Sequence, residues 1–168
     1  PMLSIDNLRD VIILDRLTDQ MLEKFQPHID VLHYDEEDII FREGDPADRF
    51  YFLKYGKILL EKKISEKISF AIGAIKPGYS FGWSAMLEEA PGYTTRTVCA
   101  EPCEVYSLRS TKLRVLLTED PQIGFLFMQR LLWVVKTRLD HRTAQFVTVL
   151  RNHPDIENLI SCCVIQIS

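Results

Sequence analysis

The residues with the clearest chemical potential begin at Pro77. The stretch from Pro77 to Leu87 reads Pro-Gly-Tyr-Ser-Phe-Gly-Trp-Ser-Ala-Met-Leu. A glycine turn, a two-residue strand, a second glycine and a short helix-capable run would present backbone N–H groups at a helix start, where an anion is stabilised. The pattern therefore predicts a phosphate-binding loop whose donors are the N–H groups of Gly82 to Ala85.

A second polar stretch follows at Tyr93 to Val98 and reads Tyr-Thr-Thr-Arg-Thr-Val. In an extended strand Arg96 projects to the same face as Thr94, so its guanidinium could reach an anion near the helix start. The alternative is a strand-edge arginine with its head in water, and threonine is also an ordinary strand residue. The candidate ligand-binding set is Phe81, Gly82, Trp83, Ser84, Ala85, Thr94, Thr95 and Arg96.

The rest of the sequence gives little support for a catalytic or metal-binding site. The histidines at 28, 33, 141 and 153 are scattered, and no Ser/His/Asp or Cys/His grouping stands out. The four cysteines, Cys99, Cys103, Cys162 and Cys163, lack zinc-site spacing. We therefore predict no enzymatic activity, no metal and no cofactor. Without a signal peptide, reduced thiols in a cytoplasmic protein are expected.

The length and the net charge of the chain narrow the classes of protein to which it could belong. The chain has 168 residues, a formal net charge of −4 and a pI of about 5.6. This balance favours neither nucleic acid nor an anionic membrane as a partner. No apolar run is long enough to span a bilayer, and the length suits a single domain with an appended helix.

The elements that position these residues follow from periodicity. Residues 5 to 26 fit two short helices with an N-cap at Thr18 or Asp19. Short apolar runs separated by turns then predict a β-sandwich or barrel. The expected strands are Val31 to Tyr34, Ile39 to Phe41, Phe50 to Lys54, Lys57 to Lys63, Ile68 to Ile75, Thr95 to Ala100 and Glu104 to Leu108.

The helical period begins at Ser110, which is predicted to cap a helix through Leu117. Pro121 is predicted to open a long helix that reaches about Asn152. Its coiled-coil spacing predicts a homodimer interface at Met128, Leu132, Val135, Leu139, Phe146 and Val149, with Arg142 awkward in the same seam. A second stripe, Ile123, Phe127, Leu131 and Val134, is expected to pack on the sandwich, although one broad stripe on a single domain is the alternative. Residues 153–168 are expected to form a turn of helix and a strand-like tail.

These motifs resemble the phosphate-binding cassette of cyclic-nucleotide-binding domains. The resemblance continues upstream from Tyr34 to Leu53 and at Gly56, and covers residues 20 to 140. It implies a mainly β fold with flanking helices: a double-stranded β-helix sandwich of the jelly-roll or cupin-like kind, followed by a long C-terminal helix. The expected organisation is a roll with N-terminal helices in 1–120, a dimerisation and transmission helix in 121–152, and a tail in 153–168.

Two family contacts are changed. The family's glutamate, which accepts a hydrogen bond from the ribose 2′-hydroxyl, is replaced by Trp83, and indole only donates. The family's phosphate-binding arginine falls on Thr94, six residues before Ala100. Trp83 has three interpretations: a plug that fills the sugar pocket, a stacking platform for a flat ligand, or an exposed anchor for a partner. Plugging or packing is favoured, because a large apolar side chain prefers burial.

Two functions stay open from the sequence. One is a stand-alone regulatory or sensory domain that binds a small anion, possible cAMP or cGMP binding being weak, and signals through the long helix. The other is an interaction module with the same fold that has lost the nucleotide and binds a protein partner. Transcription regulators of the catabolite-activator type carry a helix-turn-helix after the long helix; residues 153–168 are too few and lack a basic cluster, so no DNA binding is expected.

Overall fold

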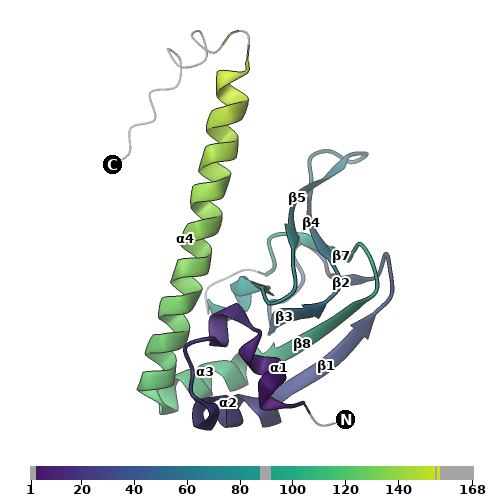
Figure 1. Ribbon diagram of the computed structural model, residues 1–168. Helices are drawn as coiled ribbons and strands as arrows, with labels where there is room; N and C mark the ends of the chain where they lie inside the picture. Colours follow the sequence, from purple (N-terminus) through teal and green to yellow (C-terminus); the bar gives the residue numbers. More distant parts are fainter. Residues whose placement is uncertain (1–2, 88–91, 154, 156–168) are drawn as a thin grey trace. The chain divides into compact units, whose positions relative to one another are not determined.

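The computed structural model describes residues 3–87, 92–153 and 155 (Figure 1). Four short helical elements come first: α1 (Ile5–Arg9), η1 (Ile12–Leu14), α2 (Asp19–Phe25) and η2 (Gln26–His28). The strands are β1 (Ile29–Tyr34), β2 (Ile39–Phe41), β3 (Arg49–Tyr55), β4 (Ile58–Lys63), β5 (Ser69–Ile75), β6 (Ser80–Phe81), β7 (Arg96–Cys99) and β8 (Cys103–Arg109). The 3₁₀ helix η3 (Trp83–Met86) lies between β6 and β7, and α3 (Ser110–Glu119) and α4 (Pro121–Arg151) follow β8.

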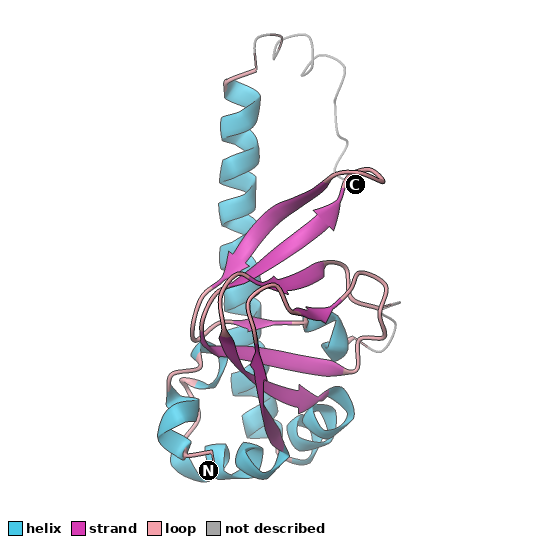
Figure 2. Ribbon diagram, turned by 90° about the vertical axis from the view of Figure 1, so that its right-hand side faces the viewer, coloured by secondary structure: helices cyan, strands magenta, loops and turns pink. Residues whose placement is uncertain are grey.

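The strands form two four-stranded antiparallel sheets. Their orders are β1-β8-β3-β6 and β2-β7-β4-β5, so neighbours in each sheet are mostly distant in sequence. Figure 2 shows the two layers and the hairpin of β4 and β5, which extends beyond the other strands. The predicted mainly β sandwich, with its jelly-roll topology and long C-terminal helix, is confirmed, and each expected strand is present with boundaries shifted by at most two residues.

The space between the sheets is filled by side chains from both layers. Strand alternation directs every second residue inward. On β3 this brings Tyr51 and Leu53 into the core, and on β7 it brings in Thr97 and Cys99. The sandwich therefore has a continuous apolar interior, and the cassette lies along one part of it.

The local signals at the helix starts were partly right. Thr18 is the N-cap of α2, and its hydroxyl accepts from the Met21 N–H at 3.4 Å. Ser110 as a cap is wrong: it is the first helical residue of α3, its side chain is buried, and the N-cap Arg109 makes no side-chain cap bond. Ser110 lies inside the helix because β8 continues to Arg109 before the chain turns.

Helix α4 begins at Pro121, as its sequence predicts. Asp120 caps it by accepting from the Ile123 N–H at 3.2 Å, a cap that the sequence reasoning missed. Lys24 also donates to Asp120 at 2.6 Å, and mainly for that reason the pKa of Asp120 is lowered. A carboxylate at this position also complements the helix dipole.

The chain divides into two compact units, and the division falls between Arg130 and Leu131, inside α4. The predicted boundaries at 120 and 152 are not tested by this division and stay predictions. Of the predicted dimer stripe, Val135 is half-buried and the other members are exposed: Met128, Leu132, Leu139, Phe146 and Val149. The second stripe, Ile123, Phe127, Leu131 and Val134, is buried. The predicted tail lies outside the described residues except for His153 and Asp155.

Candidate functional site

The cassette has the predicted local structure. Strand β6 ends at Phe81, Gly82 adopts φ 74° and ψ 33°, and η3 begins at Trp83. A Cβ on Gly82 would lie 2.9 Å from Tyr51 Cδ2 and 3.1 Å from the Arg49 carbonyl oxygen. Gly82 is therefore required twice, by its left-handed backbone and by the close approach of β3.

The donor run is shorter than the sequence suggested. The Ala85 N–H donates to the Gly82 carbonyl at 3.1 Å, which closes the 3₁₀ turn, and Ala85 is buried. The tight turn therefore already uses the Ala85 N–H, which weighs against its predicted contact with an anion, and anion binding at this loop stays a prediction. Ser84 is half-buried in the same turn, and its carbonyl accepts from the Leu87 N–H at 3.1 Å.

Trp83 packs within the cassette. Its side chain is half-buried, and Nε1 donates to the Ser80 hydroxyl at 3.0 Å. The position that would need an acceptor for a ribose hydroxyl therefore holds a donor that already has a partner. This geometry supports the packing interpretation over the exposed anchor.

Arg96 lies on the outer face of its sheet. Strand alternation buries Thr97 and Cys99 and turns Arg96 the other way. Its Nη1 donates to Glu61 Oε2 at 2.7 Å, and Glu61 is its register partner on β4. Because β7 begins only at Arg96, Thr94 precedes the strand and does not share its alternation. The predicted approach of Arg96 to an anion beside η3 is therefore unsupported.

Lys62 on β4 contacts the segment that precedes β7. Its Nζ donates to the Thr94 carbonyl at 2.9 Å and forms an ion pair with Glu43. Thr94 is exposed and Thr95 half-buried. Sequence reasoning overlooked Lys62, whose strand parity with the inward-packed Leu60 was the available signal. Both Lys62 and Arg96 thus have carboxylate partners.

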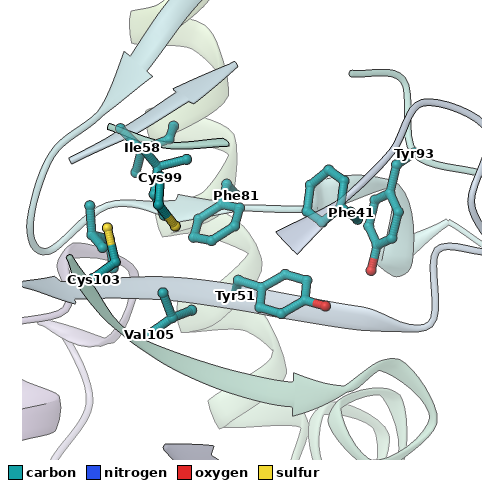
Figure 3. Packing of buried hydrophobic residues seen from close by; sticks show 10 residues of the cluster. Phe41, Tyr51, Ile58, Phe81, Tyr93, Cys99, Cys103 and Val105 are labelled. Atoms are coloured by element: carbon teal, nitrogen blue, oxygen red, sulfur yellow. The ribbon is translucent and has the colours of Figure 1, made fainter. Parts of the chain in front are cut away.

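Four aromatic rings fill the interior beside the cassette. We call Phe41, Tyr51, Phe81 and Tyr93 the aromatic cluster; Figure 3 shows them with their neighbours. Tyr93 stacks on Phe41 with ring centroids 3.7 Å apart, and Tyr51 stacks on Phe81 at 5.1 Å. Phe41 joins the two pairs, since it lies 5.7 Å from Tyr51 and 6.1 Å from Phe81. All four side chains are at most 6% exposed.

The Tyr93 hydroxyl anchors this cluster to β3. It donates to the Arg49 carbonyl at 2.7 Å and accepts from the Arg49 N–H at 3.1 Å. Burial raises the pKa of both Tyr93 and Tyr51, so both phenols stay neutral at physiological pH. The Arg49 guanidinium itself is bound by Asp30 at 2.8 Å and by the Ser107 hydroxyl at 2.7 Å.

Within residues 3–87, 92–153 and 155, no group of three or more His, Cys, Asp or Glu side chains is placed to hold a metal ion. None of the helices in that part of the chain is both long and apolar enough to cross a bilayer. Cys99 and Cys103 are buried free thiols, whereas Cys162 and Cys163 lie outside the described residues.

The chain belongs to the cyclic nucleotide-binding domain family, whose model matches residues 31–120. Among curated relatives, cyclic nucleotide-gated ion channel 2 of Arabidopsis thaliana is 26% identical over 110 residues, which are 61% of this chain and 14% of the channel. The cAMP-activated global transcriptional regulator CRP of Pasteurella multocida is 24% identical over 105 residues, 62% of this chain and 50% of the regulator. The chain therefore matches half or less of each of these relatives.

Solved structures show the same fold. A putative cyclic nucleotide-binding protein from Geobacter metallireducens has a TM-score of 0.72 at 23% identity, covering 82% of this chain and 99% of that chain. A cyclic nucleotide-binding domain from Methylobacillus flagellatus has a TM-score of 0.76 at 18% identity, covering 86% and 84%. These proteins confirm the architecture, and the family model confirms the resemblance seen in the sequence.

Proposed function

We propose that this chain is a regulatory module of the cyclic nucleotide-binding fold that acts through a protein partner and does not bind cAMP or cGMP in its roll. The observation that carries the proposal is the aromatic cluster, in which Tyr93 occupies the interior next to η3 and is held at both ends, by stacking on Phe41 and by Arg49. A ring fixed in this way takes the volume that a ligand entering between η3 and β7 would need.

The energetic cost of admitting a nucleotide follows from that burial. Removing a buried aromatic side chain from its packing costs about 3–5 kcal/mol. A ligand that had to displace Tyr93 would carry this cost in its binding free energy, which weakens affinity by about a hundredfold to a few thousandfold.

Electrostatics supports the same conclusion. A cyclic phosphate would have to compete with Glu61 for Arg96 or with Glu43 for Lys62. Arg96 also faces away from the interior, so pairing with an internal phosphate would require the strand to turn over. The sensor alternative keeps the hydroxyls of Ser84, Thr94 and Thr95 and the backbone donors, one of which is already used within η3.

We further propose that two copies associate through the exposed stripe of α4. Leu132, Leu139, Phe146 and Val149 are each 60–68% exposed and recur at near-heptad spacing. Large apolar side chains at such spacing would be buried in a parallel or antiparallel helix pair, which gives the stripe its favourable environment.

The test is isothermal titration of the intact chain with cAMP, cGMP and cyclic dinucleotides. We expect no saturable heat at nucleotide concentrations up to about 1 mM, equivalent to a binding free energy weaker than about −4 kcal/mol. Saturable binding at about 10 μM or tighter would overturn the proposal in favour of the sensor. Arg96→Ala then identifies the phosphate site, because only a sensor that uses this guanidinium would lose affinity.

Trp83→Glu provides the matched comparison. It restores an acceptor where the family has one but leaves the aromatic cluster in place, so we expect no saturable heat from this variant either. Binding by Trp83→Glu alone would show that the indole, rather than Tyr93, excludes the nucleotide.

A further inference from the structure

Strand β5 is an unusually unprotected sheet edge. Four strands end the two sheets: β2 has three residues, β6 has two, and β1 carries Asp30 and His33. In contrast, β5 spans seven residues, Ser69–Ile75, and contains no charged residue and no proline. Proteins normally protect such edges with short strands, charges or proline, so a long uncharged edge is a template for another strand. Its one protective feature is a bulge where the β4–β5 register shifts between Leu60 and Glu61.

The polar backbone of β5 is available near the hairpin end. The Ile64 N–H donates to the Ile68 carbonyl at 2.9 Å, so this pair is hydrogen-bonded across the hairpin. Hydrogen-bonded and non-hydrogen-bonded pairs alternate in an antiparallel ladder. The pairs Lys63–Ser69 and Glu61–Ala71 are therefore of the second kind, and Ser69 and Ala71 direct their N–H and C=O groups to the open edge.

The two faces of the hairpin differ in chemistry. Ile64, Ile68 and Phe70 share one face with Lys62, the register partner of Phe70. The three apolar residues are 67%, 56% and 56% exposed. Lys63 lies on the opposite face and Lys67 in the turn, and both are exposed. Arg96 pairs with Glu61, and Glu43 pairs with Lys62, so the remaining charges of the hairpin are Lys63, Glu66 and Lys67, a net of +1 on a chain of net charge −4.

We propose that the open edge of β5 binds an extended segment of a partner protein in which apolar residues alternate with acidic ones. Added beside β5, such a segment gains main-chain hydrogen bonds from Ser69 and Ala71. Its alternate side chains then meet the apolar face at Ile68 and Phe70, while its carboxylates come within reach of the long Lys63 and Lys67 side chains. The inference rests on the proposed function, since it names the surface and the kind of partner.

The test selects the ligand from a display library of random peptides about twelve residues long, long enough to cover the strand. The library is panned on the intact chain, and enriched peptides are synthesised and measured by fluorescence anisotropy. We expect enrichment of sequences in which Val, Ile or Phe alternate with Asp or Glu. No enrichment, or enriched peptides without that alternation, would overturn the proposal.

Three variants locate the bound peptide. Ala71→Pro removes an edge donor without removing a bond to β4, and Phe70→Ser removes the apolar contact. Each is expected to weaken binding about tenfold or more. The matched control is Val115→Ser on α3, since Val115 is 50% exposed and lies outside the hairpin; it should bind like the unmodified chain. Equal effects of Phe70→Ser and Val115→Ser would refute the assignment.

The charge contribution has its own control. Lys63→Glu with Lys67→Glu should weaken the acidic peptides and bind peptides whose acidic residues are changed to lysine. Failure of this exchange would show that the partner is not selected by charge. Thermal melts of all variants verify folding, and the serine and charge variants test the site even where Ala71→Pro does not fold.

Two other occupants would overturn the inference. Self-association that sedimentation shows to be lost in Ala71→Pro would make the occupant a second copy of this chain. Binding to phosphatidylserine vesicles that is lost in Phe70→Ser would make it a membrane surface. Failure of the proposed function is separate, because it is recorded as saturable nucleotide binding in the titration, which none of the hairpin variants alters.

Discussion

The Tyr93 hydroxyl offers a sharp test of the filled interior. Tyr93→Phe keeps the ring stacked on Phe41 and removes only the oxygen that bonds both the carbonyl and the N–H of Arg49, at 2.7 and 3.1 Å. A buried backbone group left without its partner costs about 1–3 kcal/mol. We therefore expect the free energy of unfolding to fall by about 1–3 kcal/mol.

The measurement is equilibrium unfolding in urea, followed by tryptophan fluorescence and far-ultraviolet circular dichroism. The expected change is a lower midpoint with an unchanged slope, because the surface exposed on unfolding stays the same. Tyr55→Phe is the matched control: Tyr55 ends the same strand and is 67% exposed, so its loss should be below about 0.5 kcal/mol. Equal losses in the two variants would show that the hydroxyl does not anchor the cluster.

Three further outcomes are expected. Gly82→Ala should lower the free energy of unfolding in urea by about 2–4 kcal/mol, because of the positive φ of Gly82 and its close approach to β3. Gly44 has φ +88° and no atom within 4 Å of an added Cβ, so Gly44→Ala should cost only the conformational part, about 1–2 kcal/mol. Equal losses in the two variants would contradict the steric argument. Burial raises the pKa of Cys99 from 9.0 and of Tyr106 from 10.0, each to about 12. The stability that depends on these two groups being neutral is therefore fully present below pH 9 and falls as pH rises toward 12, by at most about 1.4 kcal/mol per pH unit and group. A free energy of unfolding in urea that stays constant from about pH 9 to 11 would refute this. Leu139→Glu should convert a dimer to a monomer in sedimentation equilibrium, and a chain that is already monomeric contradicts the helix interface.

The fold could be predicted because its signals are local and repeated. The strand Ile39–Phe41 was placed to the residue, since an apolar run between turns has few alternatives. Pro121 located the start of α4 for the same kind of reason, because its missing N–H suits a first turn. Ser110 failed because N-cap preference reports residue type, whereas the end of β8 decides where the helix begins.

The candidate site was harder, because it depends on which face a side chain takes. Arg96 was expected to share a face with Thr94, but the strand begins at Arg96 and alternation turns its guanidinium toward Glu61. The signal was present in Glu61, an opposite charge on a strand that pairs with β7, but register cannot be obtained from composition. Tyr93 was overlooked because its role comes from stacking on Phe41, a residue that is distant in sequence.

The framework and the ligand contacts of this fold are physically separable. Gly82 and the β3–β6 pair of Tyr51 with Phe81 are required by backbone geometry and packing, and they remain whatever the pocket contains. A cyclic phosphate, in contrast, needs a charged side chain that points inward, whereas Arg96 points outward and pairs with Glu61. A chain can therefore keep the sequence pattern and the roll of its family while the interior changes from a binding site to a packed core. Under the proposed function, partner recognition falls to exposed features, and both the β5 edge and the α4 stripe carry large exposed apolar side chains.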